Sequence, residues 1–259
     1  MSAGRNTIAI AGVLIALLTG CHLPGRPGPG PEVPRPEEIT NFKQLYGENC
    51  AGCHGENGEN GPATNLANPA YEALIDNASL RNVITNGEKG TLMPSFSVYS
   101  GGDLTDIQID AIIRGMRAHW FKGNVLAAQN APPYKATHPG NIGDGQAVYS
   151  AACARCHGAT AQQPGPAGSI LDGAFLGLIN QHTIRTTIIA GRPDVGQPDW
   201  RNLIPGRPLT DAEVTDVSAW LVAQTPANPG QPYPDSHGTR PTSEKPDEAQ
   251  PKAVKRTQP

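Results

Sequence analysis

Two short segments of the chain combine paired thiols with an imidazole. Cys50-Ala-Gly-Cys53-His54 and Cys153-Ala-Arg-Cys156-His157 both have the pattern C-x-x-C-H. This pattern is the attachment signature of c-type haem. Two thiols at this spacing reach the two vinyl groups on one side of the macrocycle, and the next residue places an imidazole under the iron. The sequence therefore predicts two covalently bound haem c groups, with His54 and His157 as proximal iron ligands.

Two other kinds of site also use paired cysteines. In a zinc site the pairs usually lie a few tens of residues apart, whereas about a hundred residues separate them here. Thiol redox chemistry does not explain why a histidine follows both pairs. The chain has five cysteines, and the fifth is Cys21. If four cysteines hold haem and Cys21 carries lipid, as argued below, none is left for a disulfide.

The elements that position these motifs occur twice. Five landmarks recur at offsets of 103 to 105 residues, and so small a drift indicates two copies of one unit. The landmarks are Tyr46 to Gly55 with Tyr149 to Gly158, Gly61-Pro62 with Gly165-Pro166, Leu80-Arg81 with Ile184-Arg185, Gly87 with Gly191, and Leu104 to Asp106 with Leu209 to Asp211.

The residue pattern of each copy predicts three helices separated by Gly- and Pro-rich loops. Neither copy has the alternating apolar and polar pattern of a β-strand. The last helix starts at an N-cap threonine, and Thr210 to Glu213 has capping-box spacing. The glycine after each middle helix is a predicted C-cap. The predicted spans are 40–51, 78–86 and a helix after Thr105 in the first copy, and 144–154, 182–190 and a helix after Thr210 in the second.

The composition limits how such a chain can fold. Only 37% of the 259 residues are hydrophobic, while 30 are Gly and 26 are Pro. Three short helices per copy give a meagre core unless a large apolar cofactor lies between them. No apolar run of 18 residues follows the N-terminus, which excludes a polytopic membrane protein. The net charge of −3 gives no electrostatic reason to expect nucleic-acid binding.

With these motifs and this repeat, the chain resembles class I cytochrome c, and it looks like a diheme cytochrome c lipoprotein. The resemblance implies a mainly α fold with two tandem haem domains and irregular loops. We expect domain one over 40–121, an interdomain linker over 122–142 and domain two over 143–225. A Pro-rich linker over 21–39, with six prolines after Cys21, and a disordered Pro-rich tail over 226–259 are expected to flank them.

The N-terminal sequence indicates that the protein is exported and then anchored to a membrane. An 11-residue apolar run, Ile8 to Leu18, precedes Leu18-Thr19-Gly20-Cys21, and such a run fits a signal peptide over 1–20. The residues before Cys21 resemble a bacterial lipobox, which implies cleavage before Cys21 and its lipidation. An ordinary signal peptide and an uncleaved anchor are the alternatives. The mature protein is thus expected on the periplasmic, extracytoplasmic side of a bacterial membrane, held there by lipid.

The sixth iron ligand is expected to differ between the copies. Met93, followed by Pro94, resembles the methionine ligand loop of the family, whereas Met116 lies on an apolar helix face and is expected to pack. At the aligned position the second copy has Gln197. Three interpretations are open: Gln197 or water at the iron, a histidine ligand, or a more distant protein ligand. The candidate histidines are His119, His138 and His182.

Four arginines lie near these loops. Arg81 and Arg185 occupy equivalent positions, and Arg192 and Arg201 flank Gln197. Each is expected either to pair with a haem carboxylate or to lie in solvent at the surface.

The resemblance implies a carrier of single electrons between other redox proteins, either by itself or as a subunit of a respiratory or photosynthetic membrane complex. The alternative is a diheme enzyme of the peroxidase or thiosulfate-oxidising type that uses the second haem. Asp194 and Asp199 are the only acidic groups close to Gln197 in the sequence, so the carrier is favoured over the enzyme.

Overall fold

The computed structural model describes residue 30 and residues 33–229, and the fold divides between Ile39 and Thr40 into two parts that are described separately. The first part contributes the short 3-10 helix η2 (Pro36–Glu38), where Arg35 pairs with Glu38. The second part is mainly helical, and β-structure in the described residues is limited to isolated bridges. The predicted mainly α fold is therefore confirmed.

Several predicted features fall outside this part of the chain. The predicted signal peptide, Cys21, most of the Pro-rich linker and residues 230–259 of the predicted tail lie outside the described residues. In the described ranges, no helix combines the length and the apolar character needed to cross a membrane.

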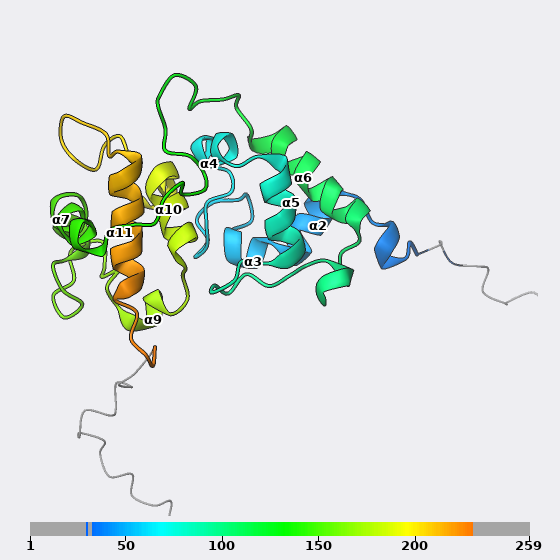
Figure 1. Ribbon diagram of the computed structural model, residues 1–259. Helices are drawn as coiled ribbons and strands as arrows, with labels where there is room; N and C mark the ends of the chain where they lie inside the picture. The colour runs from blue at the N-terminus through cyan, green and yellow to red at the C-terminus, as the bar shows by residue number, and fades with distance from the viewer. Residues whose placement is uncertain (1–29, 31–32, 230–259) are drawn as a thin grey trace, which may run out of the picture. The chain divides into compact units, whose positions relative to one another are not determined.

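The helices follow the same order in the two repeats (Figure 1). Repeat one contains α2 (Phe42–Asn49), α3 (Ala51–His54), α4 (Pro69–Leu74), α5 (Asn77–Asn86), η3 (Val98–Ser100) and α6 (Asp106–Trp120). Repeat two contains α7 (Ile142–Ala152), α8 (Ala154–His157), α9 (Gly173–Leu176), α10 (Gln181–Ala190), η4 (Pro193–Val195) and α11 (Asp211–Ala223). The predicted first, middle and last helices are all confirmed, within a few residues of their expected bounds.

The structure adds two short helices, α4 and α9, where the sequence predicts irregular loops. Asn68 caps α4 by accepting a hydrogen bond from Ala70 N, and Pro69 occupies its first turn. Asp172 caps α9 in the same way. Both segments are too short to show helical periodicity, so only these caps, with Pro69 at the first turn, could have indicated them.

The last helix of each repeat begins with a capping box. Thr210 Oγ1 accepts from Glu213 N, and the Glu213 carboxylate accepts from Thr210 N. Thr105 and Gln108 make the equivalent pair of bonds at the start of α6. Because α6 has glutamine and α11 has glutamate at the third position, the capping box of α11 is the easier one to recognise in the sequence.

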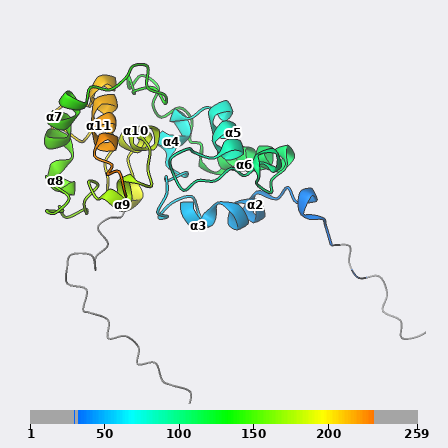
Figure 2. The same cartoon turned by 60° about the horizontal axis from the view of Figure 1, so that its bottom comes forward.

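The core of each repeat forms where this last helix packs on the other helices. In repeat one α6 packs against α2 and α5, with Met116 buried at the contact as predicted. In repeat two α11 packs against α7 and α10, and Figures 1 and 2 both show it between them. Tyr149 lies against Trp220 there, with ring centroids 4.8 Å apart. Since α2 and α7 end at the first cysteine of each C-x-x-C-H motif, this packing supports the motifs.

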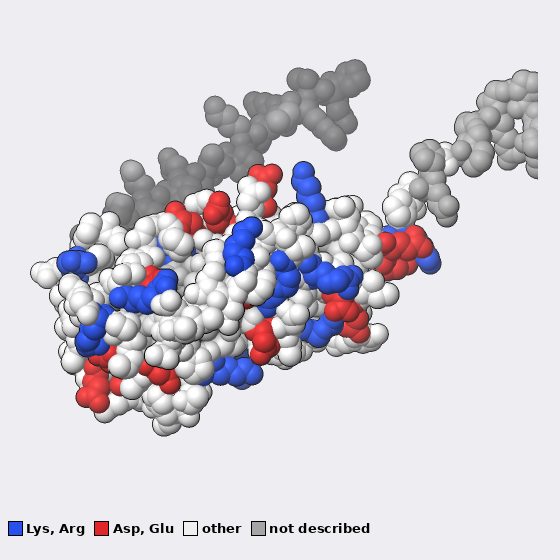
Figure 3. All heavy atoms as spheres, turned by 90° about the horizontal axis from the view of Figure 1, so that it is seen from above, with Lys and Arg blue, Asp and Glu red and all other residues white. Residues whose placement is uncertain are grey.

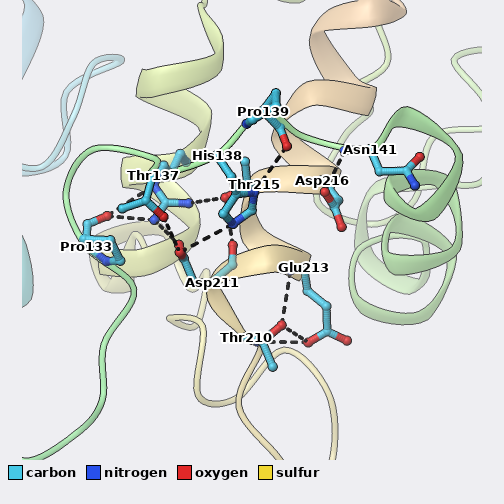
Figure 4. A network of polar contacts seen from close by, with 11 residues as sticks. Pro133, Thr137, His138, Pro139, Asn141, Thr210, Asp211, Glu213, Thr215 and Asp216 are labelled. Carbon is cyan, nitrogen blue, oxygen red and sulfur yellow. Dashed lines mark hydrogen bonds and ion pairs between the residues drawn. The ribbon is translucent and has the colours of Figure 1, made fainter.

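Arg185 ties the chain before repeat two to α11. Its guanidinium donates to Pro133 O at 2.8 Å and to Thr215 Oγ1 at 2.7 Å, and it pairs with Asp211. Figure 4 shows Pro133, Thr215 and Asp211 side by side in this network. The Arg185 side chain is only 2% exposed, so the structure corrects both expectations for it: Arg185 is a buried structural residue, held by protein groups.

Candidate haem sites

The first C-x-x-C-H motif lies where two short helices meet. Cys50 ends α2, where its N–H donates to Tyr46 O, and it is also the N-cap of α3. Cys53 and His54 follow on the single turn of α3, and His54 N donates to Cys50 O at 3.0 Å. Residues three and four apart are neighbours on a helix. Cys50 is therefore a neighbour of both Cys53 and His54, and both thiols are free of disulfide bonds.

The His54 imidazole is held by a backbone carbonyl. Its Nδ1 lies 2.7 Å from Thr64 O, and the residue is 8% exposed. Because a carbonyl only accepts, Nδ1 is the protonated nitrogen, and Nε2 keeps its lone pair for a metal. Burial lowers the pKa of His54; the Thr64 bond opposes this effect, and the positive charge of Arg192 adds to it. These features suit a neutral imidazole ligand.

Repeat two reproduces this arrangement. Cys153 ends α7, and Cys156 and His157 lie on α8. Nδ1 of His157 lies 3.0 Å from Gly168 O, and Gly168 aligns with Thr64 at the offset of 104 residues. Thr64 and Gly168 were not predicted as site residues, because they contribute only their backbone carbonyls.

Close backbone approach explains why Gly61 and Gly165 recur. A Cβ at Gly61 would lie 2.3 Å from Cys53 O, and one at Gly165 would lie 2.3 Å from Cys156 O. Neither distance is possible for a real Cβ, so both positions require glycine. The repeated Gly-Pro dipeptide was the sequence signal for this contact.

The first cysteine of each motif is held largely away from water. Burial raises the pKa of Cys50 to about 12, and a nearby Cys53 adds to the effect. Burial also raises the pKa of Cys153 to about 12, and the nearby Cys156 adds to the effect. Burial thus keeps these two thiols protonated near neutral pH. Within residues 33–229, no three His, Cys, Asp or Glu side chains come together to hold a metal ion, so the four cysteines do not form one zinc site.

Met93 lies in the loop that follows α5. Its carbonyl accepts from Glu88 N at 3.1 Å, and its N–H donates to Thr91 Oγ1. Gly87, with φ of +71°, ends α5 beside it, and a Cβ on Gly87 would lie 2.6 Å from Met93 O. The left-handed φ and this close contact both require glycine, as the predicted C-cap implies.

Gln197 occupies the equivalent backbone position in repeat two. Its carbonyl accepts from Arg192 N at 3.0 Å, and Arg192 aligns with Glu88. Gly191 has the same φ as Gly87, +71°, and a Cβ on it would lie 3.0 Å from Gln197 O. This one backbone bond matches the expected alignment of Met93 with Gln197. The other bond differs, since Gln197 N donates to Arg192 O at 2.9 Å whereas Met93 N donates to Thr91 Oγ1.

The loops also rejoin the last helices in the same way. Leu104 N donates to Phe96 O at 2.7 Å, and Leu209 N donates to Trp200 O at 2.9 Å. Trp200 is 1% exposed, so this junction is buried.

The three candidate histidines each have a partner of their own. His182 lies edge-on to Tyr134 with ring centroids 4.4 Å apart, and His119 stacks on Phe42. His138 lies 3.6 Å from Asp211. The structure thus places each of them against a protein group outside the Gln197 loop.

The remaining arginines pair with carboxylates of the chain. Arg81 pairs with Asp110, and Arg201 pairs with Asp199 and lies over the Trp200 ring. Arg192 pairs with Asp194 and is 13% exposed. It also donates to Gly61 O in repeat one, a contact for which the sequence offered no signal.

Comparison with known proteins identifies the two repeats. The family model described as cytochrome C oxidase, cbb3-type, subunit III, matches residues 37–114 and again residues 140–221. A chain of the Kuenenia stuttgartiensis reducing HAO-like protein complex is 17% identical, with 75% of this chain and 100% of that chain covered and a TM-score of 0.42. No match was found among curated proteins. Each family match contains one C-x-x-C-H motif.

Proposed function

Because the chain belongs to the family of cytochrome c oxidase, cbb3-type, subunit III, whose cytochrome c domains bind haem and transfer electrons, we propose that it is a diheme electron carrier. Two haems bind covalently: haem one at Cys50 and Cys53, and haem two at Cys153 and Cys156. The bound iron supplies one-electron redox chemistry. The chain holds the two groups, orients their ligands and limits access of water.

The observation that carries this proposal is the matched support of the two proximal histidines. His54 and His157 each have Nδ1 against a backbone carbonyl, at 2.7 Å and 3.0 Å. This bond fixes the imidazole and leaves Nε2 for iron in both repeats. A chain that used one repeat only as a scaffold would have no need to keep this bond twice.

The proposed sixth ligands are Met93 in repeat one and Gln197, or water, in repeat two. The equivalent backbone bonds of the two loops support this assignment, as do the separate partners of the three histidines. A methionine ligand raises the potential of c-type haem, so the two haems are expected to differ.

We place the carrier at the extracytoplasmic side of a bacterial membrane, anchored by lipid on Cys21, where it exchanges electrons with other redox proteins. It acts as a subunit of a respiratory or photosynthetic complex, or docks to one. Lys and Arg lie interspersed with Asp and Glu on the face drawn in Figure 3. That face offers no single-sign surface of the kind that nucleic acids bind.

One measurement tests the core of this proposal. Purified protein is denatured, and its haem is measured against polypeptide by pyridine haemochrome and intact mass. Two haems should remain per chain, and Cys50→Ser/Cys53→Ser should leave one. A chain that retains zinc and no haem would overturn the proposal.

A second candidate function is favoured by Gln197 alone. A haem without a thioether ligand has a site that a small molecule could enter, as in a peroxidase or a thiosulfate-oxidising enzyme. Turnover of peroxide or thiosulfate by the diheme protein, lost in Gln197→Met, would favour the enzyme. Rapid electron exchange with a redox mediator and no turnover would favour the carrier.

A further inference from the structure

Arg192 contacts the surroundings of both proposed haem sites. Its backbone exchanges two hydrogen bonds with Gln197, at 3.0 Å and 2.9 Å, and its Nη2 donates to Gly61 O at 2.8 Å. We propose that Arg192, with Asp194, is a positioning residue for the His54 imidazole, and that this buried ion pair tunes the potential of haem one. The inference rests on the diheme function proposed above.

Gly61 connects Arg192 to His54. The Cβ that Gly61 lacks would stand 2.6 Å from the backbone carbon of His54, so the two backbones are in contact. Three residues after Gly61, Thr64 provides the carbonyl that binds His54 Nδ1. The Arg192 bond therefore fixes one end of a four-residue segment whose other end orients the imidazole.

Asp194 holds the same segment at two further points. Its Oδ2 accepts from Asn60 N at 3.0 Å, and the Asn65 side chain, after Arg192, lowers the pKa of the Asp194 carboxyl. Asp194 in turn accepts from Arg192 Nε at 3.0 Å and from Nη2 at 2.7 Å. The pair thus contacts the segment before, at and after Gly61.

The ion pair is shielded from solvent. The side chain of Arg192 is 13% exposed and that of Asp194 is 1% exposed. Charges in such a place are screened less than surface charges. Removal of one partner leaves the other uncompensated, and an uncompensated charge beside the iron ligand favours one oxidation state. A cation favours the ferrous iron, and an anion favours the ferric iron.

The equivalent position of repeat one does not have this role. Glu88 aligns with Arg192, and its carboxylate accepts from Asn180 Nδ2 at 2.6 Å. Asn180 is the N-cap of α10, far along the sequence from His157. The contacts therefore run from the Gln197 loop to the His54 loop, and the expected influence is on haem one.

The test uses the full-length diheme protein with Arg192→Gln and Asp194→Asn. Arg207→Gln is the control, because it removes a cation paired with Glu213 at the start of α11. Haem content, redox titration and electron paramagnetic resonance are measured, and haem one is followed by its thioether-to-iron absorption. Haem one should fall in potential in Arg192→Gln and rise in Asp194→Asn, with altered g-values in both. Arg207→Gln should leave haem one as in the parent.

Opposite signs in the two variants separate a charge effect from loosened packing. Shifts in the same direction, or a haem one unchanged in both variants, would overturn the inference while two haems per chain leave the diheme function standing. Absence of covalent haem in the parent would instead end the proposed function. If Arg192→Gln does not fold, Arg192→Lys keeps the charge and loses the planar fork. It should then alter the g-values of haem one more than its potential, and unaltered g-values would overturn the inference.

Discussion

Gly61 packs against Cys53, and a Cβ at Gly61 would lie 2.3 Å from the Cys53 carbonyl oxygen. Gly61→Ala should therefore displace the loop that supports His54 and cost about 1–3 kcal/mol, the usual cost of overpacking. The thermal midpoint should fall, and the fraction of chains with haem at the first motif should fall with it.

Gly52 provides a matched control for that substitution. It lies inside the same C-x-x-C-H motif, where a Cβ would meet no atom within 4 Å. Gly52→Ala should keep full haem content and a midpoint no lower than the parent, since Ala is the better helix former. Equal loss in both variants would show that the motif tolerates no substitution, whatever the local space.

The carbonyls of Met93 and Gln197 accept equivalent backbone hydrogen bonds, so exchange of the ligand side chain should exchange the behaviour of the haems. In Met93→Ala only haem one should lose its thioether-to-iron absorption. In Gln197→Met the lower of the two potentials should rise toward the higher, because a thioether stabilises ferrous iron. Optical redox titration of the three proteins measures this. Equal potentials and two thioether bands in the parent would mean that another sulfur reaches haem two.

The expected lipidation of Cys21 predicts that the protein is found in the membrane fraction of the cell. Cys21→Ser should move the protein from the membrane fraction to the soluble fraction, because one or more acyl chains would be lost. Cell fractionation followed by haem staining measures this. Tight membrane association of the variant would indicate an uncleaved anchor or a partner complex in place of the lipid.

The capping box of α11 should make stability depend on pH in the acid range. Hydrogen bonds from Arg207 and then from Thr210, opposed by burial, lower the pKa of Glu213 from 4.5 to about 2. Because the folded pKa is the lower one, the contribution is complete above about pH 4.5 and is lost as the pH falls through about 2. It amounts to about 1 kcal/mol.

Thermal melts between about pH 5 and pH 2, followed by circular dichroism, measure that loss. Glu213→Gln keeps an acceptor for the cap and should remove this part of the pH dependence. Thr210→Ala should cost about 1 kcal/mol even at neutral pH. A parent and a Glu213→Gln variant with the same acid profile would contradict the assignment.

The sequence predicted the features that recur in both repeats and those that depend on only a few neighbouring residues. C-x-x-C-H motifs, N-cap threonines and C-cap glycines each act within a few residues, so the pattern alone located the haem motifs and the main helices. The 104-residue offset then paired Met93 with Gln197, a relationship that the backbone bonds reproduce.

What the sequence did not predict depends on contacts between distant residues. The carbonyl that binds His54 belongs to Thr64, and any residue there would provide the same atom. Arg192 reaches Gly61 across 131 positions of the chain, and its charge carries no sign of that partner. Arg185 was expected to bind haem or lie at the surface. Its partner Pro133 lies in the linker, outside the repeat, so the alignment of the two copies does not show this contact.

The contact between Arg185 and Pro133 determines where a folded fragment of repeat two can begin. The equivalent ion pair of repeat one, Arg81 with Asp106, has side chains that are 36% and 63% exposed, whereas the Arg185 side chain is 2% exposed. A fragment that begins at Asn141 would open the Arg185 pair to water and remove the carbonyl of Pro133. The smallest fragment of repeat two that folds by itself should therefore begin before Pro133, so the copied unit is shorter than the folding unit.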